Sequence, residues 1–179
     1  EAAAAVGLPA VCTLSFDTNG RTMMGVTPRR FAELAHACDH GPLAFGGNCG
    51  TGAPDLLAGL LSMADEVGPG DVLVAKANCG IPEFVDGAIR YSGTEDLMAD
   101  YAVLARDMGA RIIGGCCGTS PAHVRAMRTA LETRPRGEKP SLERIIEVLG
   151  PLTGKTGDLM SAHGAPAPEG RAGRRRRRG

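Results

Sequence analysis

The sequence predicts an α/β protein with a parallel sheet, and two regularities indicate this fold class. Short runs of β-branched and small apolar residues alternate with longer stretches in which apolar residues recur every three or four positions, as expected for buried strands and amphipathic helices. One helix follows each strand, which is typical of a parallel sheet. The 179 residues are 43% hydrophobic but only 3% aromatic. The core is therefore expected to consist of small and aliphatic side chains that allow close packing of helices on strands.

Four strand–helix units are expected along the chain. The strands cover residues 11–16, 43–45, 72–78 and 111–115. The helices that follow them cover residues 28–38, 54–67, 95–108 and 121–132. Three helices start after a Ser or Thr that can cap the first turn, at Thr27, Thr94 and Ser120, and a proline follows two of these caps. The segment between the third strand and Thr94 contains several Gly and Pro residues and is expected to be a long loop.

The two ends of the chain differ from this pattern. Residues 1–7 are expected to be the end of a helix, because an alanine run that stops at Gly7 needs earlier turns for stability. Ser141 starts a short helix over residues 142–149. Gly, Ala, Pro and Arg dominate the later part of the chain, which predicts one domain over 1–150 and a disordered tail over 151–179. The run Arg174–Arg178 in this tail is expected to be solvated.

The composition argues against several classes of function. The formal net charge is zero, so no overall field favours nucleic acid or membrane as a partner. The sequence shows no signal-peptide pattern and no apolar run near the roughly 20 residues that span a bilayer. A cytoplasmic protein is therefore expected. Thiols stay reduced in that compartment, so the six cysteines are expected to be ligands or core residues rather than disulfides.

Three cysteines follow expected strands and suggest a metal site. Gly46-Gly47-Asn48-Cys49 follows the second strand, and Gly114-Gly115-Cys116-Cys117 ends the fourth. The carboxyl ends of parallel strands lie at one edge of the sheet, where such folds build their sites. Adjacent side chains on a regular strand point to opposite faces of the sheet. Cys116 and Cys117 can therefore bind the same metal ion only where the neighbouring glycines let the backbone leave strand geometry.

Three thiolates suit zinc, and three protein ligands leave a fourth position open, as in catalytic zinc sites. A substrate thiol in that position would lose its proton and become a sulfur nucleophile at neutral pH. The simpler alternative is that the cysteines are only buried core residues. Because two cysteine-bearing segments each follow a double glycine, the metal site is favoured over this alternative.

The other cysteines and the histidines have simpler interpretations. Cys12 lies within a strand and Cys38 near a helix end, and both are assigned to packing. Cys79 also follows a strand, so it is either a fourth ligand or a core residue. His36 and His123 fall within expected helices and are assigned to the surface or to capping. A vicinal disulfide between the adjacent cysteines is a third possibility for the site, disfavoured by its distorted geometry.

These motifs together resemble the zinc-dependent homocysteine S-methyltransferase family, which includes betaine-homocysteine methyltransferase and the homocysteine domain of cobalamin-dependent methionine synthase. The resemblance depends on Gly46-Gly47-Asn48-Cys49 and on Gly114-Gly115-Cys116-Cys117-Gly118-Thr119 with Pro121 and His123 after it. Further matches are Gly20-Arg21-Thr22 with Gly25, and Asn78 followed by Gly80-Ile81-Pro82. The similarity covers about residues 8–131.

The resemblance implies a TIM (β/α)₈ barrel, of which this chain supplies the carboxyl-terminal half, about four βα units. The family's Asp-Gly-Gly segment for homocysteine, and an acidic residue from the middle of the barrel, have no counterpart in this sequence. Four units cannot close an eight-stranded barrel, so the open edges imply an oligomer or a missing amino-terminal half.

The resemblance also implies a chemistry. Zn²⁺ would be held by Cys49, Cys116 and Cys117, and a methyl group would pass to the thiol of homocysteine to form methionine, with betaine or a related small donor favoured over folate. Asn48 and Asn78 would line the amino-acid end of the substrate, or else serve only as loop hydrogen-bonding groups. Relatives commonly carry Ala at the position of Cys79, which leaves that thiol outside the metal shell. The alternative function is an inactive, truncated zinc-binding fragment of such an enzyme.

Overall fold

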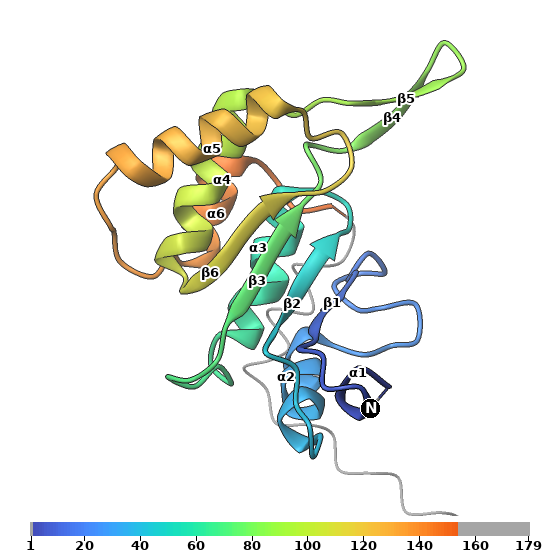
Figure 1. Cartoon of the computed structure of the whole chain (residues 1–179). Helices are drawn as coiled ribbons and strands as arrows, with labels where there is room; N and C mark the ends of the chain where they lie inside the picture. Colours follow the sequence, from blue (N-terminus) through green and yellow to red (C-terminus); the bar gives the residue numbers. More distant parts are fainter. Residues whose placement is uncertain (1, 154–179) are drawn as a thin grey trace, which may run out of the picture.

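The computed structural model describes residues 2–153, and its centre is an open parallel sheet of four strands (Figure 1). The strands are β1 (Val11–Leu14), β2 (Ala44–Cys49), β3 (Leu73–Ala77) and β6 (Ala110–Gly115). They pair side by side in the order β1-β2-β3-β6, and every pair is parallel. The spatial order therefore follows the chain order, as expected for consecutive βα units. This arrangement is compatible with part of a TIM-type domain, although the described residues do not form a closed barrel.

Four of the six described helices begin where the capping residues predict. The six helices are α1 (Ala2–Ala5), α2 (Pro28–Ala37), α3 (Ala53–Met63), α4 (Glu95–Asp107), α5 (Pro121–Thr133) and α6 (Leu142–Leu149). The side-chain oxygens of Thr27, Thr94, Ser120 and Ser141 each accept a hydrogen bond from a backbone N–H in the first turn of the following helix. Each of these hydrogen bonds satisfies a donor that the helix itself leaves unpaired.

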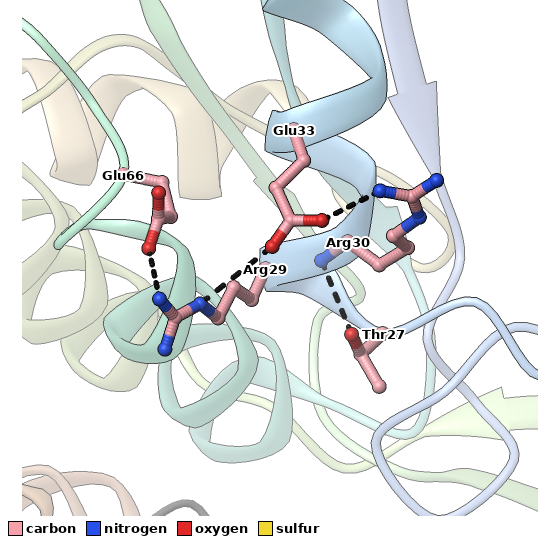
Figure 2. A network of polar contacts seen from close by, with 5 residues as sticks. All are labelled: Thr27, Arg29, Arg30, Glu33 and Glu66. Carbon is pink, nitrogen blue, oxygen red and sulfur yellow. Dashed lines mark hydrogen bonds and ion pairs between the residues drawn. The ribbon is translucent and has the colours of Figure 1, made fainter.

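A network of polar contacts at the start of α2 joins this helix to the chain after α3 (Figure 2). Thr27 caps the helix by accepting from the backbone N–H of Arg30 at 3.1 Å, and the Arg30 guanidinium pairs with Glu33 at 2.7 Å. Arg29 reaches out of the helix to Glu66 at 2.7 Å. Because most of these side chains are exposed to solvent, each ion pair is expected to contribute no more than about 1 kcal/mol to stability.

The second strand is longer than the sequence predicts. The sequence predicts that this strand ends before the double glycine, but Gly46 pairs with Val74 and Gly47 with Ala75 in the ladder between β2 and β3. A Cβ at Gly46 would lie 2.0 Å from the carbonyl oxygen of Val74. The glycine therefore allows a close approach of two strands, one of the uses of glycine within a sheet.

The segment assigned to a long loop contains a β-hairpin instead. Strands β4 (Pro82–Val85) and β5 (Ala88–Tyr91) pair antiparallel and project from the body of the molecule (Figure 1). Asp86 and Gly87 connect them with φ values of 51° and 78°. Positive φ at both central residues is typical of a two-residue turn that fits the twist of a hairpin, and Asp-Gly is a strong sequence signal for it.

The main core lies between the sheet and its helices. Phe45 of β2 packs its ring against Phe31 and His36 of α2. Tyr101 of α4 is fully buried, and its hydroxyl accepts from the backbone N–H of Ala77 at 3.1 Å and donates to the carbonyl of Gly114 at 3.3 Å. This one side chain therefore joins α4 to the ends of β3 and β6, directly below the cysteine-bearing segments.

The prediction that Cys12 and Cys38 are packed inside the protein is wrong. Cys12 and Cys38 are both exposed. Cys12 lies on β1, which forms one edge of the described sheet, so that strand has a neighbour on one side only. Cys38 is the residue that ends α2, and its thiol donates to the carbonyl of Leu34 at 3.3 Å. In contrast, Cys79 is only 1% exposed, which confirms its assignment to the core.

Within the described residues, no helix is both long and apolar enough to cross a bilayer. The boundary between the domain over 1–150 and the tail falls directly after α6. This boundary stays a prediction. Residues 154–179, which make up most of the tail predicted over 151–179 and include Arg174–Arg178, lie outside the described residues.

Candidate metal centre

The three cysteines expected at the edge of the sheet are brought together. Cys49 is the last residue of β2, and Cys116 and Cys117 directly follow β6. The Cys117 Sγ atom lies 3.8 Å from that of Cys49 and 3.9 Å from that of Cys116, and all three Sγ atoms lie within 4.8 Å of one another. Zinc–sulfur bonds of about 2.3 Å at tetrahedral angles would place two sulfurs about 3.8 Å apart. The sulfur positions therefore fit one zinc ion.

All six cysteines of the chain are free thiols. The separation of 3.9 Å between the sulfurs of Cys116 and Cys117 is far from the roughly 2.05 Å of a disulfide. Cys116 and Cys117 therefore do not form a vicinal disulfide in this structure.

The backbone leaves strand geometry at these cysteines. Cys49 has a φ of 60°, in the left-handed region that residues other than Gly rarely adopt. This backbone conformation costs about 1–3 kcal/mol. Gly118 follows the cysteine pair with a φ of 76°. At the other strand the N–H of Cys116 still donates to the carbonyl of Ala77 at 2.7 Å. The turn therefore begins directly after this last ladder bond, where two adjacent thiols can approach one centre.

Asn78 bridges the two cysteine-bearing segments. Its side-chain oxygen accepts from the backbone N–H of Cys117 at 3.1 Å, and its side-chain N–H₂ donates to the carbonyl of Gly50 at 2.7 Å. The residue is 3% exposed. These contacts match the loop-bonding alternative for Asn78. Its predicted contact with substrate stays a prediction.

Asn48 has a different environment from Asn78. It is half-buried on β2, next in the chain to Cys49, and its side-chain N–H₂ lies 3.4 Å from the hydroxyl of Ser15. Its side chain is therefore held less tightly than that of Asn78. A substrate contact for Asn48 also stays a prediction.

The thiols differ in their ease of ionisation. Burial raises the pKa of Cys49 above its ordinary value, and the hydrogen bond with Cys117 adds to this shift. The pKa of Cys117 is lowered, first by its hydrogen bond with Cys49 and then by one with Tyr91. Without a metal, Cys117 therefore becomes a thiolate at lower pH than Cys49.

Tyr91 is a residue of the site that sequence reasoning missed. It ends β5, and its ring lies against Gly118, the residue after Cys117, where a Cβ would come within 2.3 Å of the ring atom Cγ. The sequence signal that could have found it is the Asp86-Gly87 turn, because a two-residue hairpin places Tyr91 opposite Pro82, next to the end of β3.

Cys79 is not part of the sulfur cluster. Its Sγ lies 3.3 Å from Nε2 of His123 and donates to the carbonyl of Gly93 at 3.4 Å. Nδ1 of His123 accepts from the backbone N–H of Ser120 at 3.0 Å, so the ring proton is on Nε2 and points to the Cys79 sulfur. The capping role expected for His123 is confirmed, because it completes a capping box at the start of α5.

The comparison with protein families agrees with this geometry. The family model described as homocysteine S-methyltransferase matches residues 1–131. This range contains all three cysteines of the cluster and the four βα units that position them, except for the last two residues of α5. Members of this family transfer a methyl group to homocysteine and typically depend on zinc. The chain belongs to the homocysteine S-methyltransferase family.

Proposed function

We propose that this protein transfers a methyl group to the thiol of homocysteine to form methionine, with Zn²⁺ held by Cys49, Cys116 and Cys117. The observation that carries the proposal is the sulfur triangle, with edges of 3.8 and 3.9 Å at Cys117, in a chain of this family. Sulfur ligands at these separations suit a tetrahedral ion with one position open to substrate.

When bound, zinc would supply a Lewis acid that keeps a substrate thiol ionised at neutral pH. The protein's own residues hold the three sulfur ligands in position. Asn78 keeps the Cys49 and Cys117 segments at a fixed separation through its two hydrogen bonds. Tyr101 fixes the ends of β3 and β6 beneath them. A site held in this way loses little entropy when substrate enters.

The transfer itself is a displacement at a methyl carbon. The substrate sulfur forms the new S–CH₃ bond as the bond between that carbon and the donor nitrogen breaks, and the electron pair of the broken bond stays on nitrogen. We propose betaine or a related small onium compound as the donor. Asn48, half-buried beside Cys49, is our proposed contact for the amino-acid end of homocysteine. The proposal places the protein in the cytoplasm, where thiols stay reduced.

The test is an assay of methyl transfer by the zinc-loaded chain. Homocysteine is supplied with betaine or with a methylated folate in separate reactions, and methionine is measured by mass spectrometry. Methionine formed with betaine, and lost when Cys117→Ser is used, is the expected result. A chain that holds zinc but forms no methionine with any donor would instead support the alternative, a noncatalytic zinc-binding protein.

A further inference from the structure

One face of the parallel sheet packs against helices, and the opposite face carries Lys76. Leu73, Ala75 and Ala77 of β3 belong to the core that the sheet forms with its helices. Successive side chains on a strand point to opposite faces, so Lys76 lies on the face that points away from these helices. It is half-buried there, whereas Ala75 and Ala77 are fully buried.

The neighbours of Lys76 across the sheet lie close to the sulfur cluster in the chain. Asn48 of β2 and Gly114 of β6 are both in register with it. Asn48 directly precedes Cys49, and Gly114 lies two residues before Cys116. Gly114 has no side chain, and the Cγ atom of Lys76 lies 3.9 Å from the position that a Cβ of Gly114 would occupy. Lys76 and Asn48 are therefore neighbours on the sheet, one register position before Cys49.

The Lys76 ammonium group has no anionic partner within residues 2–153. No carboxylate of this part of the chain pairs with it, whereas Lys139 pairs with Asp65 at 2.9 Å. A charged group that is partly removed from water loses part of its hydration, and an anion can compensate for this loss. Lys76 is therefore a free cation for an anion that binds on this face of the sheet.

We infer that Lys76, together with Asn48, binds the carboxylate of homocysteine. Homocysteine is a short molecule with its thiol and its carboxylate at opposite ends, so a substrate whose sulfur is held at the three cysteines has its carboxylate close to the row of residues before Cys49. Ammonium and amide N–H groups both donate to carboxylate oxygens, and the bond from the ammonium group is charge-assisted. The inference depends on the proposed function and adds to it the residue that recognises the acid group of the substrate.

The experiment measures how strongly zinc-loaded full-length chains bind homocysteine and its decarboxylated analogue, which keeps the thiol and the amino group. Isothermal titration calorimetry gives both affinities, and their ratio reports the contribution of the carboxylate. Lys76→Met and Lys76→Gln remove the charge, and Lys76→Arg keeps it. Lys139→Met is the matched control, because it removes the same charge from an exposed ion pair with Asp65.

Elemental analysis and circular dichroism confirm the zinc content and the fold of each chain, and either neutral variant that folds is sufficient for the test. We expect the wild type to prefer homocysteine, and the neutral variants to lower this ratio of affinities roughly tenfold, as for the loss of a hydrogen bond to a charged group. The affinity for the analogue should stay the same. Lys76→Arg should keep part of the preference for homocysteine, and Lys139→Met should keep all of it.

Three results would overturn the inference and leave the proposed function intact: a wild type that binds both compounds equally, an unchanged ratio in the neutral variants, or an equal loss of affinity for both compounds. In the last case Lys76 would support the site as a whole and not the carboxylate. A zinc-loaded wild type that binds neither compound would overturn both the inference and the proposed function.

Discussion

Single residues set the spacing of the three sulfurs, and Asn78 is the clearest example. Its buried amide connects the backbone of Gly50, next to Cys49, with the backbone of Cys117 itself. Groups that orient metal ligands from behind often matter almost as much for metal affinity as the ligands. The residue type was visible in the sequence, but its partners were not, because they lie 28 and 39 positions away.

Asn78→Ala should lower zinc affinity about 10- to 100-fold. The substitution removes both hydrogen bonds and leaves the N–H of Cys117 without its acceptor. Competition with a chromophoric chelator measures the affinity. Asn48→Ala is the matched control, because Asn48 lies beside Cys49 but bonds to Ser15, and it should keep the zinc affinity of the wild type. Equal affinities for all three chains would contradict the role given to Asn78.

At the scale of secondary-structure elements, β2 must approach β3 closely for Cys49 to lie near Cys116 and Cys117. Gly46 makes this possible, because any side chain there would meet the backbone of Val74. Backbone atoms within a sheet cannot move aside as the end of a flexible side chain can. The position of Cys49 therefore depends on a glycine three residues earlier.

Gly46→Ala should lower the free energy of unfolding by about 2–3 kcal/mol through overpacking. Gly70→Ala is its control, because a Cβ at Gly70 meets no atom within 4 Å, and it should change stability by less than about 0.5 kcal/mol. Urea unfolding followed by circular dichroism compares the two. If both variants unfold at the same urea concentration as the wild type, the close approach of β2 and β3 is not a constraint on the sequence.

Many of the helices and strands could be predicted from the sequence, because the signals that mark them are local. Thr27 and Ser120 mark helix starts by their own side chains, and the glycine–cysteine segments mark the edge that carries the site. The exposure of Cys12 could not be predicted, since it depends on which strand forms the edge of the sheet. The placement of Tyr91 could not be predicted either, because the sequence predicts a long loop between the third strand and Thr94, and without the β4–β5 hairpin this residue has no defined neighbours.

At the scale of the whole molecule, the described sheet has two open edges, at β1 and β6. Beside β6 lies a groove of about 280 Å³ between this strand and α5, lined mainly by Ile113, Val124, Met127 and Leu131 with two arginines. Ile112 on β6 is 41% exposed. Parallel strands are normally covered on both faces and paired at their edges, so these features favour association.

We therefore expect the chain to be larger in solution than its monomer mass of 18.5 kDa, as a dimer or a higher assembly. Size-exclusion chromatography with light scattering gives the mass directly. Ile112→Lys should shift the population to smaller species, because a charge on the open strand disfavours pairing. Asp39→Lys, at an exposed position just after α2, should not. A monodisperse monomer that unfolds cooperatively would contradict the expectation.

The central claim is that Cys49, Cys116 and Cys117 hold one zinc ion together, and elemental analysis of the purified chain tests it most directly. The account predicts one zinc per wild-type chain and a loss of most of this metal in Cys49→Ser, Cys116→Ser and Cys117→Ser, since each change removes one of three sulfur ligands. Cys12→Ser and Cys38→Ser, at exposed thiols outside the cluster, should keep the full content. Substoichiometric zinc in the wild type that none of these substitutions alters would contradict the account.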